Sequence, residues 1–373
     1  MQKRHEHKND DGETAMKKGK ISESVLKRSV LKYCHVKTED SGKGAGPEMD
    51  CAFLRYACGS DCERISFGEE LAVSTQTMVL PVKDPGSFAV LAAVNDLAAA
   101  GAQAFAAALA VTLPESAQEG SLKELMSQTG GTCRRLGVKI IGGHTEVTDQ
   151  ISTPIVTATA MGRPFGGRNC EVKRTLRESD SEPAIKPVGM RDKKGIQSGL
   201  DIVMTKWIGL EGTVILAGER EKELAARYPS SLIVSAREFG KYLSILPEAA
   251  AAVKFGVYAM RDIRNGGVFA ALWELGRDMG VGLSIDLKRI PVKQETIEIC
   301  EFFDLNPYEF LSGGSLLLAV KDGEELVREL GAQGIYAAVI GQSAQGNDRI
   351  IMNGEETRYL EPAKPDEILK VIH

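Results

Sequence analysis

The sequence lacks the features that would place the protein in a membrane or outside the cell. It contains no run of about 18 apolar residues, the length that spans a bilayer as a helix. Its first twenty residues carry Lys, His, Asp and Glu with almost no apolar residue, so they do not resemble the apolar core of a signal peptide. The seven cysteines are scattered through 373 residues, without the dense spacing of a secreted disulfide scaffold. We therefore expect a cytoplasmic protein with reduced thiols.

The familiar nucleotide and hydrolase motifs are also missing. No G-x-x-x-x-G-K-[ST] loop occurs, and GKGAG at 42–46 neither follows a strand nor opens a helix, as a dinucleotide-binding loop would. The sequence has no G-x-S-x-G elbow and no H-E-x-x-H motif. A formal net charge of -5 gives no electrostatic reason to expect nucleic acid or an anionic membrane as a partner. A small molecule is the expected ligand.

The remaining pattern predicts two domains of mixed helices and strands. The apolar share of 43% with 26% charged residues is typical of a soluble globular protein, and the length allows two cores. Strands and helices interleave in both halves, which indicates α+β or layered α/β domains. We expect the domains at 41–165 and 199–345, with a Gly-, Pro- and charge-rich linker or insertion at 166–198. Residues 1–40 are predicted to be a tail and a leading helix, and residues 346–373 a C-terminal extension.

A helix predicted to start at Pro85 and end at Gly101 is apolar on every face except at Asn95 and Asp96. Such a helix is expected to be buried. A buried carboxylate costs on the order of 3 kcal/mol or more unless a partner or a cation compensates it. A structural, hydrogen-bonded Asp96 is one explanation, but we favour a ligand role, since carboxylate oxygens suit Mg²⁺. A second, amphipathic helix is predicted at 119–136.

Two further aspartates stand beside glycine-rich segments. Asp50 follows SGKGAGPEM, and Asp262 precedes the pair Gly266 and Gly267. Taken alone, Asp50 is better explained as a turn cap than as a ligand. Asp262 is explained equally well as an N-cap or as a ligand. The three aspartates together are candidates for a metal site.

The stretch KIIGGHTEVTD raises a separate question, because a strand runs into two glycines and polar residues follow at once. A plain turn needs one glycine at most. The pair Gly142 and Gly143 would instead let backbone amides approach an anion, with His144, Thr145 and Glu146 beside them. We therefore expect a phosphate-facing turn here, although a structural histidine remains an alternative for His144.

Six segments, in order, resemble motifs of the aminoimidazole ribonucleotide (AIR) synthase or PurM superfamily: GPEMDCAFL, AVNDLAAAGAQA, GGHTEVT, DIVMTKWIGLEG, MRDIRNGG and SGGSLLLAV. The superfamily also includes selenophosphate synthetase, thiamine-monophosphate kinase and HypE-type hydrogenase maturation proteins. The motif sequences are most similar to those of the HypE type. The resemblance implies a two-domain PurM-like subunit. Its N-terminal domain would form a shared β-barrel in a homodimer, and its C-terminal domain would be layered α/β.

The resemblance also implies which residues form the site. ATP and Mg²⁺ would be held at the interface, with Asp50, Asp96 and Asp262 as the metal ligands. His144 and Glu146 would be the catalytic residues, Glu146 being the better candidate for a metal contact. Cofactor-binding positions implied by the same match are Lys43, Gly46, Asn95, Gly142, Gly143 and Thr145.

Two departures from the family pattern leave the reaction open. Gln76 stands where relatives usually carry an acidic residue, and no cysteine follows Cys300, whereas HypE-type carbamoyl dehydration uses a C-terminal cysteine. The leading expectation is an enzyme that uses ATP and Mg²⁺ to phosphorylate an oxygen of a small-molecule or carbamoyl-type acceptor, with a maturation protein as a partner. The alternatives are a catalytically reduced nucleotide-binding scaffold and a thiamine-monophosphate kinase-like enzyme.

Overall fold

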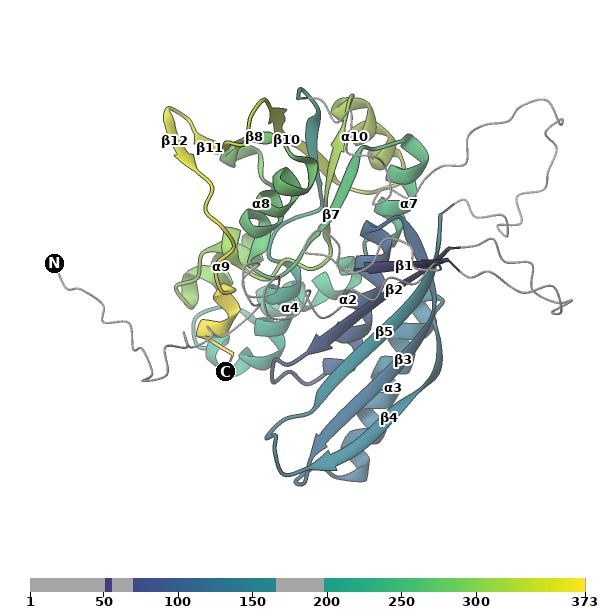
Figure 1. The fold of residues 1–373 in the computed structure, drawn as a ribbon. Helices are drawn as coiled ribbons and strands as arrows, with labels where there is room; N and C mark the ends of the chain where they lie inside the picture. Colours follow the sequence, from purple (N-terminus) through teal and green to yellow (C-terminus); the bar gives the residue numbers. More distant parts are fainter. Residues whose placement is uncertain (1–50, 56–69, 166–197, 373) are drawn as a thin grey trace, which may run out of the picture.

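The computed structural model describes residues 51–55, 70–165 and 198–372, which form two mixed α and β domains packed against each other (Figure 1). The expected tail and leading helix, the expected linker except for Ser198, and the candidate residues Lys43, Gly46 and Asp50 lie outside these residues. No helix in the described ranges combines the length and the apolar character needed to cross a membrane.

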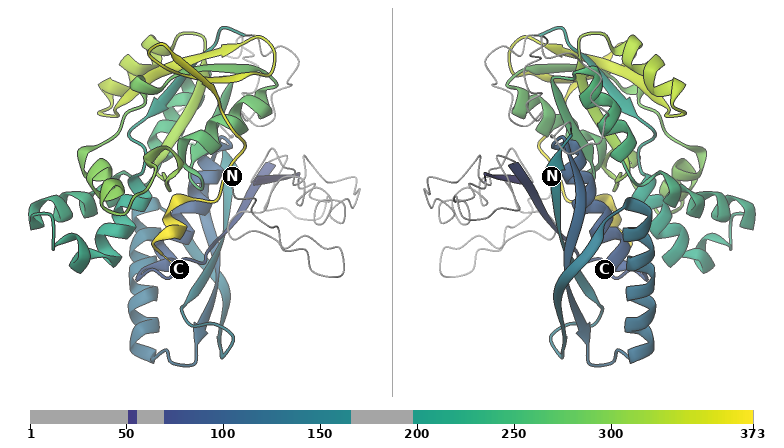
Figure 2. Two further views of the ribbon diagram at one scale, coloured as in Figure 1. Left: turned by 90° about the vertical axis from the view of Figure 1, so that its left-hand side faces the viewer. Right: turned by 90° about the vertical axis from the view of Figure 1, so that its right-hand side faces the viewer.

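The N-terminal domain is a five-stranded sheet in the order β1-β2-β5-β3-β4. Its strands are β1 (Cys51–Arg55), β2 (Glu70–Met78), β3 (Ala102–Pro114), β4 (Lys139–Thr148) and β5 (Ile155–Pro164). Strands β3 and β4 run parallel, and the other neighbours are antiparallel. Helices α2 (Pro85–Ala99) and α3 (Glu119–Leu136) lie on one face of this sheet (Figure 2).

Helix α2 is buried on all sides, as its sequence predicts. It begins where Asp84 Oδ1 accepts the Ser87 N–H at 3.1 Å, and Pro85 occupies its first turn. One side packs on strands β2, β3 and β5, and another contacts α7 (Leu246–Phe255) and β7 (Ala259–Ile263) of the second domain. Alanines along the helix allow this close approach on both sides. Asn95 and Asp96 are consequently buried at the junction between the domains.

The second domain is built on a seven-stranded sheet in the order β12-β11-β8-β10-β6-β9-β7. Its strands are β6 (Asp201–Thr205), β7 (Ala259–Ile263), β8 (Gly282–Asp286), β9 (Ser315–Val320), β10 (Ala337–Ala344), β11 (Arg349–Asn353) and β12 (Glu356–Tyr359). Its α-helices are α4 (Leu210–Glu219), α5 (Glu221–Leu224), α6 (Ser230–Glu238), α7 (Leu246–Phe255), α8 (Gly267–Met279), α9 (Gln294–Phe302) and α10 (Gly323–Ala332). Short 3-10 helices are η3 (Phe239–Tyr242), η4 (Leu287–Arg289), η5 (Pro307–Glu309) and η6 (Glu367–Lys370).

The segment after residue 345 is part of this architecture. Strand β11 pairs in parallel with β8, and β12 pairs with β11, so both extend the sheet. The chain then returns to the junction, where Ile368 and Ile372 join a hydrophobic core that also contains Leu97 of α2 and Leu216 of α4. This core is continuous between the two domains.

Strand β4 differs from the sequence prediction. The expected strand end and turn at the two glycines is wrong, because β4 continues through them and stays paired with β3. The pairing shifts between Ile140 and Gly142, which marks a bulge. At Gly143, φ is +151°, and a Cβ atom would lie 1.7 Å from the carbonyl oxygen of Leu109. A glycine is therefore required at 143 by the close approach of β3.

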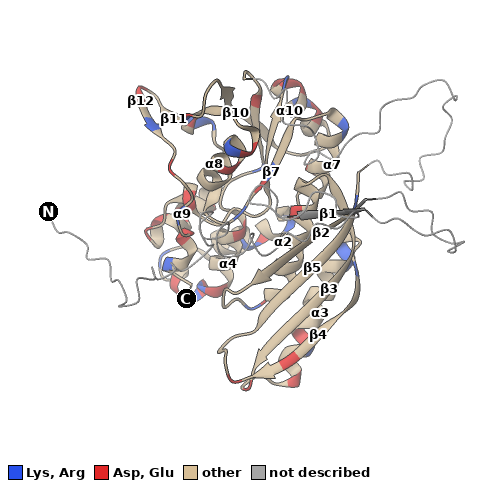
Figure 3. Ribbon diagram, in the orientation of Figure 1, with Lys and Arg blue, Asp and Glu red and all other residues tan. Residues whose placement is uncertain are grey.

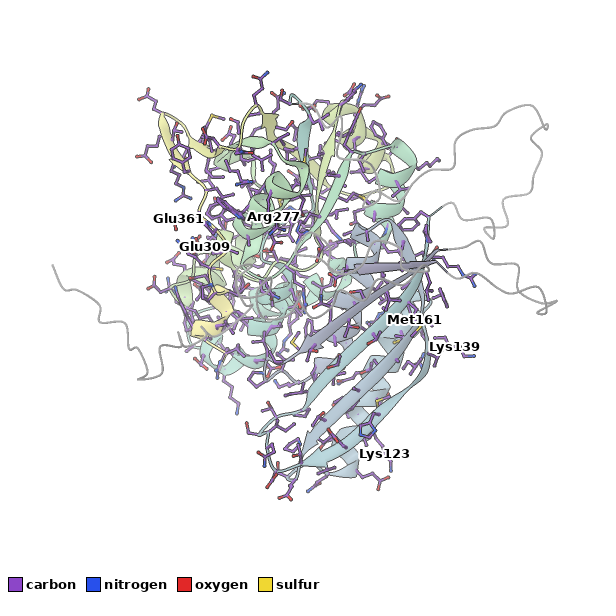
Figure 4. All side chains as sticks on the ribbon, viewed as in Figure 1. Lys123, Lys139, Met161, Arg277, Glu309 and Glu361 are labelled. Carbon is purple, nitrogen blue, oxygen red and sulfur yellow. The ribbon has the colours of Figure 1, made fainter. Side chains whose placement is uncertain are left out.

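The face of the sheet opposite α2 and α3 is open in the described structure (Figure 2). Directly paired residues share a face, and one row of exposed and half-buried residues crosses β2, β5, β3 and β4: Thr77, Thr157, Ala110 and His144. Lys, Arg, Asp and Glu are sparse on β2, β5 and β3 (Figure 3). Met161 of β5 and Lys139 at the start of β4 lie along the same sheet (Figure 4). The open face is thus broad and weakly charged.

The geometry at Gly143 gives a direct test of the β4 structure. We expect Gly143→Ala to lower the free energy of unfolding by about 2 kcal/mol or more, since a side chain here is strained and meets the β3 backbone. Gly142→Ala is the matched control, because a Cβ atom at Gly142 would meet nothing within 4 Å. Urea denaturation of both variants measures the difference, and equal stabilities would contradict the described bulge.

Candidate functional site

The carboxylate of Asp96 is held by two side chains of β2. Ser74 Oγ donates to Asp96 Oδ2 at 2.8 Å, and Gln76 Nε2 donates to the same oxygen at 2.5 Å. All three side chains lie on the helix-covered face of the N-terminal sheet, where Ser74 and Asp96 are buried. Asp96 is therefore stabilised by hydrogen bonds, as its burial requires.

Gln76 connects this pair to the second domain. Its Oε1 accepts a hydrogen bond from Arg264 Nη1 at 3.2 Å. Because a guanidinium can only donate, the amide oxygen must face Arg264 and the amide NH₂ must face Asp96. Arg264 also contacts Glu211 at both carboxylate oxygens, through Nε and Nη2, each at 3.3 Å. We call these five residues, Ser74, Gln76, Asp96, Glu211 and Arg264, the junction cluster.

Electrostatics keep the guanidinium of the junction cluster charged. The side chains of Arg264 and Glu211 are only 12% and 5% exposed. Burial alone would lower the pKa of Arg264, but the negative charges of Glu211, Asp96 and Asp262 outweigh it and raise that pKa. The three carboxylates, which come from α4, α2 and β7, are thus close enough to act on one cation.

Glycines of the second domain make room for Glu211. Its helix α4 begins after Gly209, which has a φ of +73°. A Cβ atom at Gly313 would lie 2.0 Å from Glu211 Oε2. The SGG segment before β9 is therefore needed to admit the Glu211 carboxylate.

The glycine turn after Arg264 is tied to the C-terminal segment by Asp366. Gly266 donates its N–H to Asp366 Oδ2 at 2.6 Å, while Leu311 and Ile368 donate theirs to Oδ1 at 3.1 and 3.0 Å. Burial raises the pKa of Asp366 to about 7, although the three amides oppose this shift. Asp366, which is 100 positions after Gly266 in the chain, therefore fixes the start of α8. It thereby also helps to position Arg264.

Asn95 supports the junction in a different way. Its Nδ2 donates to the Leu243 carbonyl at 2.7 Å, and its Oδ1 accepts the Ile245 N–H at 3.1 Å. The same loop is held from the other side by the buried Lys206, which donates to the Tyr242 carbonyl at 2.7 Å. Asn95 therefore has a structural role between the domains, and its predicted cofactor contact stays a prediction.

The remaining candidates lie apart from the junction cluster. His144 and Glu146 are on exposed β4, with His144 Nε2 3.4 Å from Glu146 Oε2. They pair with Ala110 and Thr112 on the open face of the sheet, whereas Gln76 lies on the helix-covered face. Gly142, Gly143 and Thr145 are on the same strand. Within one chain, the sheet separates His144 and Glu146 from Asp96, whereas Thr145 pairs with the buried Val111 and so lies on the helix-covered face.

Glu211, Arg264 and Asp366 were not predicted as site residues from the sequence. Glu211 carries a signal like that of Asp96, since it is the buried carboxylate in the apolar helix LEGTVILAGE, whose other glutamate, Glu219, is its last residue. Arg264 and Asp366 have no such local signal, because their partners lie far away in the sequence. Asp262 lies within β7, where it pairs with Leu316, and not at a helix N-cap.

The described residues of the junction cluster do not form a metal-binding site. No group of three or more His, Cys, Asp or Glu in the described ranges is placed to hold one. Asp96 Oδ2 already accepts two hydrogen bonds, and Arg264 occupies the space between Gln76 and Glu211. Of the three predicted metal ligands, Asp96 and Asp262 act on the same guanidinium, and Asp50 lies outside the described residues.

A separate cavity of about 400 Å³ lies in the second domain, and no candidate site residue lines it. Its lining residues are Lys288, Arg289, Ile290, Pro291, Glu324, Val327, Tyr336, Ala337, Ala338 and Val339.

Comparison with protein families gives two matches. Residues 49–163 match the N-terminal domain of AIR synthase related proteins, and residues 197–353 match the C-terminal domain of the same proteins. Together the two matches cover most of the chain and correspond to the two domains described above.

Individual proteins show the same relationship. A protein of Methanocaldococcus jannaschii named for hydrogenase expression and formation is 25% identical, over 90% of this chain and 91% of its own. The carbamoyl dehydratase HypE of Rhodobacter capsulatus is 25% identical over 69% of each chain. A crystal structure of HypE in complex with ATP has a TM-score of 0.59 at 18% identity, covering 95% of this chain and 98% of that one.

The buried Asp366 carboxyl predicts an unusual pH dependence of stability. Because its pKa is raised to about 7 in the folded protein, its contribution to stability is complete below the unfolded value of about 4 and is lost as the pH rises through about 7. We expect Asp366→Asn to reduce stability most at acidic pH, by a few kcal/mol, and to flatten the profile. Thermal melts from pH 5 to about pH 8 measure this.

The control for this experiment is Asp322→Asn, which alters an exposed cap whose carboxylate accepts the Glu325 N–H. The same decline in stability with pH in wild type and Asp366→Asn would contradict the assignment.

Proposed function

Because the chain belongs to the AIR synthase related proteins, we propose that it is an ATP-dependent enzyme of the HypE-like type. It phosphorylates an oxygen of a small-molecule or carbamoyl-type acceptor. With a carbamoyl-type acceptor, the phosphorylated oxygen then leaves as phosphate. The names of the similar proteins support this proposal, as they include a carbamoyl dehydratase and an ATP-bound HypE.

The observation that carries the proposal is the junction cluster. Strand β2 and helix α2 of one domain meet α4 and the turn after β7 of the other at a single buried guanidinium. Phosphoryl transfer requires positioning and neutralisation of negative charge more than covalent help from the protein. Arg264, fixed by Glu211 and Gln76, is a buried cation at the domain junction that meets this requirement.

Each residue then has a defined task in binding. Arg264 attracts the ATP phosphates toward the junction, and Gln76 and Asp96 hold the guanidinium in place. The turn at Gly266, fixed by Asp366, positions the start of α8 beside it. These tasks concern binding and orientation, and they leave the acceptor pocket unassigned.

The proposed active form is a homodimer joined through the open face of the N-terminal sheet. In a single chain, Thr77, Ala110 and His144 of this row are exposed and Thr157 is half-buried, and the strands around the row carry few charges. A second copy covering this face would bury the row and the edge strand β4. His144 and Glu146 would then lie at the contact between the two chains. A partner protein from hydrogenase maturation is proposed from the name of the Methanocaldococcus relative.

ATP binding and turnover test the proposed function. We expect isothermal titration calorimetry to show ATP binding by the full-length protein, and Asp96→Asn to weaken it about tenfold or more, since Gln76 and Arg264 lose their anchor. Asp322→Asn is the control for a lost carboxylate elsewhere. The proposal fails if the wild-type protein binds no ATP.

A second candidate is a nucleotide-binding scaffold without turnover. The observation that favours it is the Gln76 amide, which fills the space between Asp96 and Arg264 with protein hydrogen bonds. Steady formation of ADP with carbamoyl, carboxylate or amine acceptors would exclude the scaffold. Tight ATP binding without ADP formation across that panel would favour it.

The dimer is tested by placing a charge in the open face. Thr157→Arg is expected to convert a dimer into a monomer, because the new guanidinium would be buried without a partner. Lys123→Glu, on exposed α3 across the sheet (Figure 4), is the control. Light scattering after size-exclusion chromatography gives the mass. A dimeric Thr157→Arg protein, or a monomeric wild type, would contradict the proposed interface.

A further inference from the structure

The contacts of Arg264 lead to an inference that does not depend on the proposed reaction. We infer that Arg264 is the resident cation of the junction cluster and occupies the position that a divalent metal ion would otherwise take. The cluster is therefore complete without a metal, and a metal ion and the guanidinium compete for the same carboxylates.

Arg264 contacts Glu211 in a bidentate geometry. Nε and Nη2 of Arg264 each reach one carboxylate oxygen at 3.3 Å, so the guanidinium engages both oxygens side by side. Both side chains are buried, and Gly313 packs against the carboxylate. The carboxylate oxygens that a metal would need already face a cation.

The orientation of the Gln76 amide also opposes metal binding. Since Oε1 faces Arg264, the NH₂ group faces Asp96 Oδ2. A metal ion needs oxygen lone pairs around it, whereas Gln76 Oε1 already accepts from Arg264 and Asp96 Oδ2 already accepts from the Gln76 amide. Gln76 therefore links Arg264 to Asp96 by hydrogen bonds, and it occupies the Asp96 oxygen that a metal ion would require.

The junction cluster also has no room for a hydrated metal ion. Mg²⁺ dehydrates reluctantly and usually keeps several waters, so its site needs room beyond the carboxylates. The cluster is instead filled by the Arg264 side chain, whose charge is supported by Glu211, Asp96 and Asp262. Removing that side chain would leave room beside the Glu211 carboxylate, with Asp96 and Asp262 near enough to have acted on the same cation.

A metal titration without nucleotide tests this inference separately from the proposed function. Purified full-length protein is titrated with Mn²⁺, and free Mn²⁺ is followed by electron paramagnetic resonance. We expect no stoichiometric binding by the wild type up to about 1 mM, and about one Mn²⁺ per chain in Arg264→Met, at least about tenfold tighter. Arg264→Lys, which retains a cation, is expected to behave as the wild type.

A second pair of variants identifies the carboxylates and protects the test against misfolding. Adding Glu211→Gln to Arg264→Met is expected to abolish the new Mn²⁺ binding. If Arg264→Met does not fold, Arg264→Gln, which also removes the positive charge but keeps hydrogen-bonding groups beside Glu211, is expected to gain Mn²⁺ binding and a melting temperature that rises with Mn²⁺.

Two results would overturn the inference. One is stoichiometric Mn²⁺ binding by the wild-type protein that Asp96→Asn removes, since metal and guanidinium would then coexist. The other is the absence of any gain in Mn²⁺ affinity in every folded variant among Arg264→Met and Arg264→Gln.

Discussion

The buried ion pair between Arg264 and Glu211 is the interaction on which the domain junction depends. Removing one partner of such a pair leaves an uncompensated buried charge, at a cost of roughly 3 to 5 kcal/mol. The pair also determines what surrounds it. Gly313 must be a glycine to admit the carboxylate, and Gln76 must be oriented to accept from the guanidinium. Asp96 is satisfied in turn because Gln76 has its donors on that side.

The five-stranded sheet imposes a second constraint, because it divides the candidate residues between its two faces. Asp96 and Gln76 face the helices and the second domain, while His144 and Glu146 face the open side. A single chain therefore cannot combine all of them in one site through this sheet. The open face is the structural reason for including a second chain in the proposed active form.

The sequence predicted the parts of the fold that depend on local pattern. Helix α3 begins and ends at the predicted residues 119 and 136, and α2 is buried because it has no polar stripe. The family resemblance predicted the two-domain fold, which is confirmed. The prediction of a turn at Gly142 was wrong. A glycine inside a bulged strand cannot be distinguished in the sequence from a glycine in a turn, because the difference lies in the pairing with β3.

The candidate site was less predictable, for a physical reason. Asp96 could be identified from its apolar helix, but its partners come from β2 and, through Gln76, from Arg264, which is 188 positions from Gln76. Glu211 could have been identified by the same argument as Asp96. In the sequence, Gln76 differs from the acidic residue that relatives usually carry at this position, and this difference alone does not reveal its role. Its role follows from the contact with Arg264, which no local pattern contains.

A crystal structure of the full-length protein with a non-hydrolysable ATP analogue tests the central claim most directly. If the junction cluster is the working site, the phosphates will lie at the domain junction, with Arg264 as their neighbouring cation and Glu211 still in contact with it. Phosphates bound instead in the cavity lined by Lys288 and Arg289, with the junction cluster unchanged, would contradict the account.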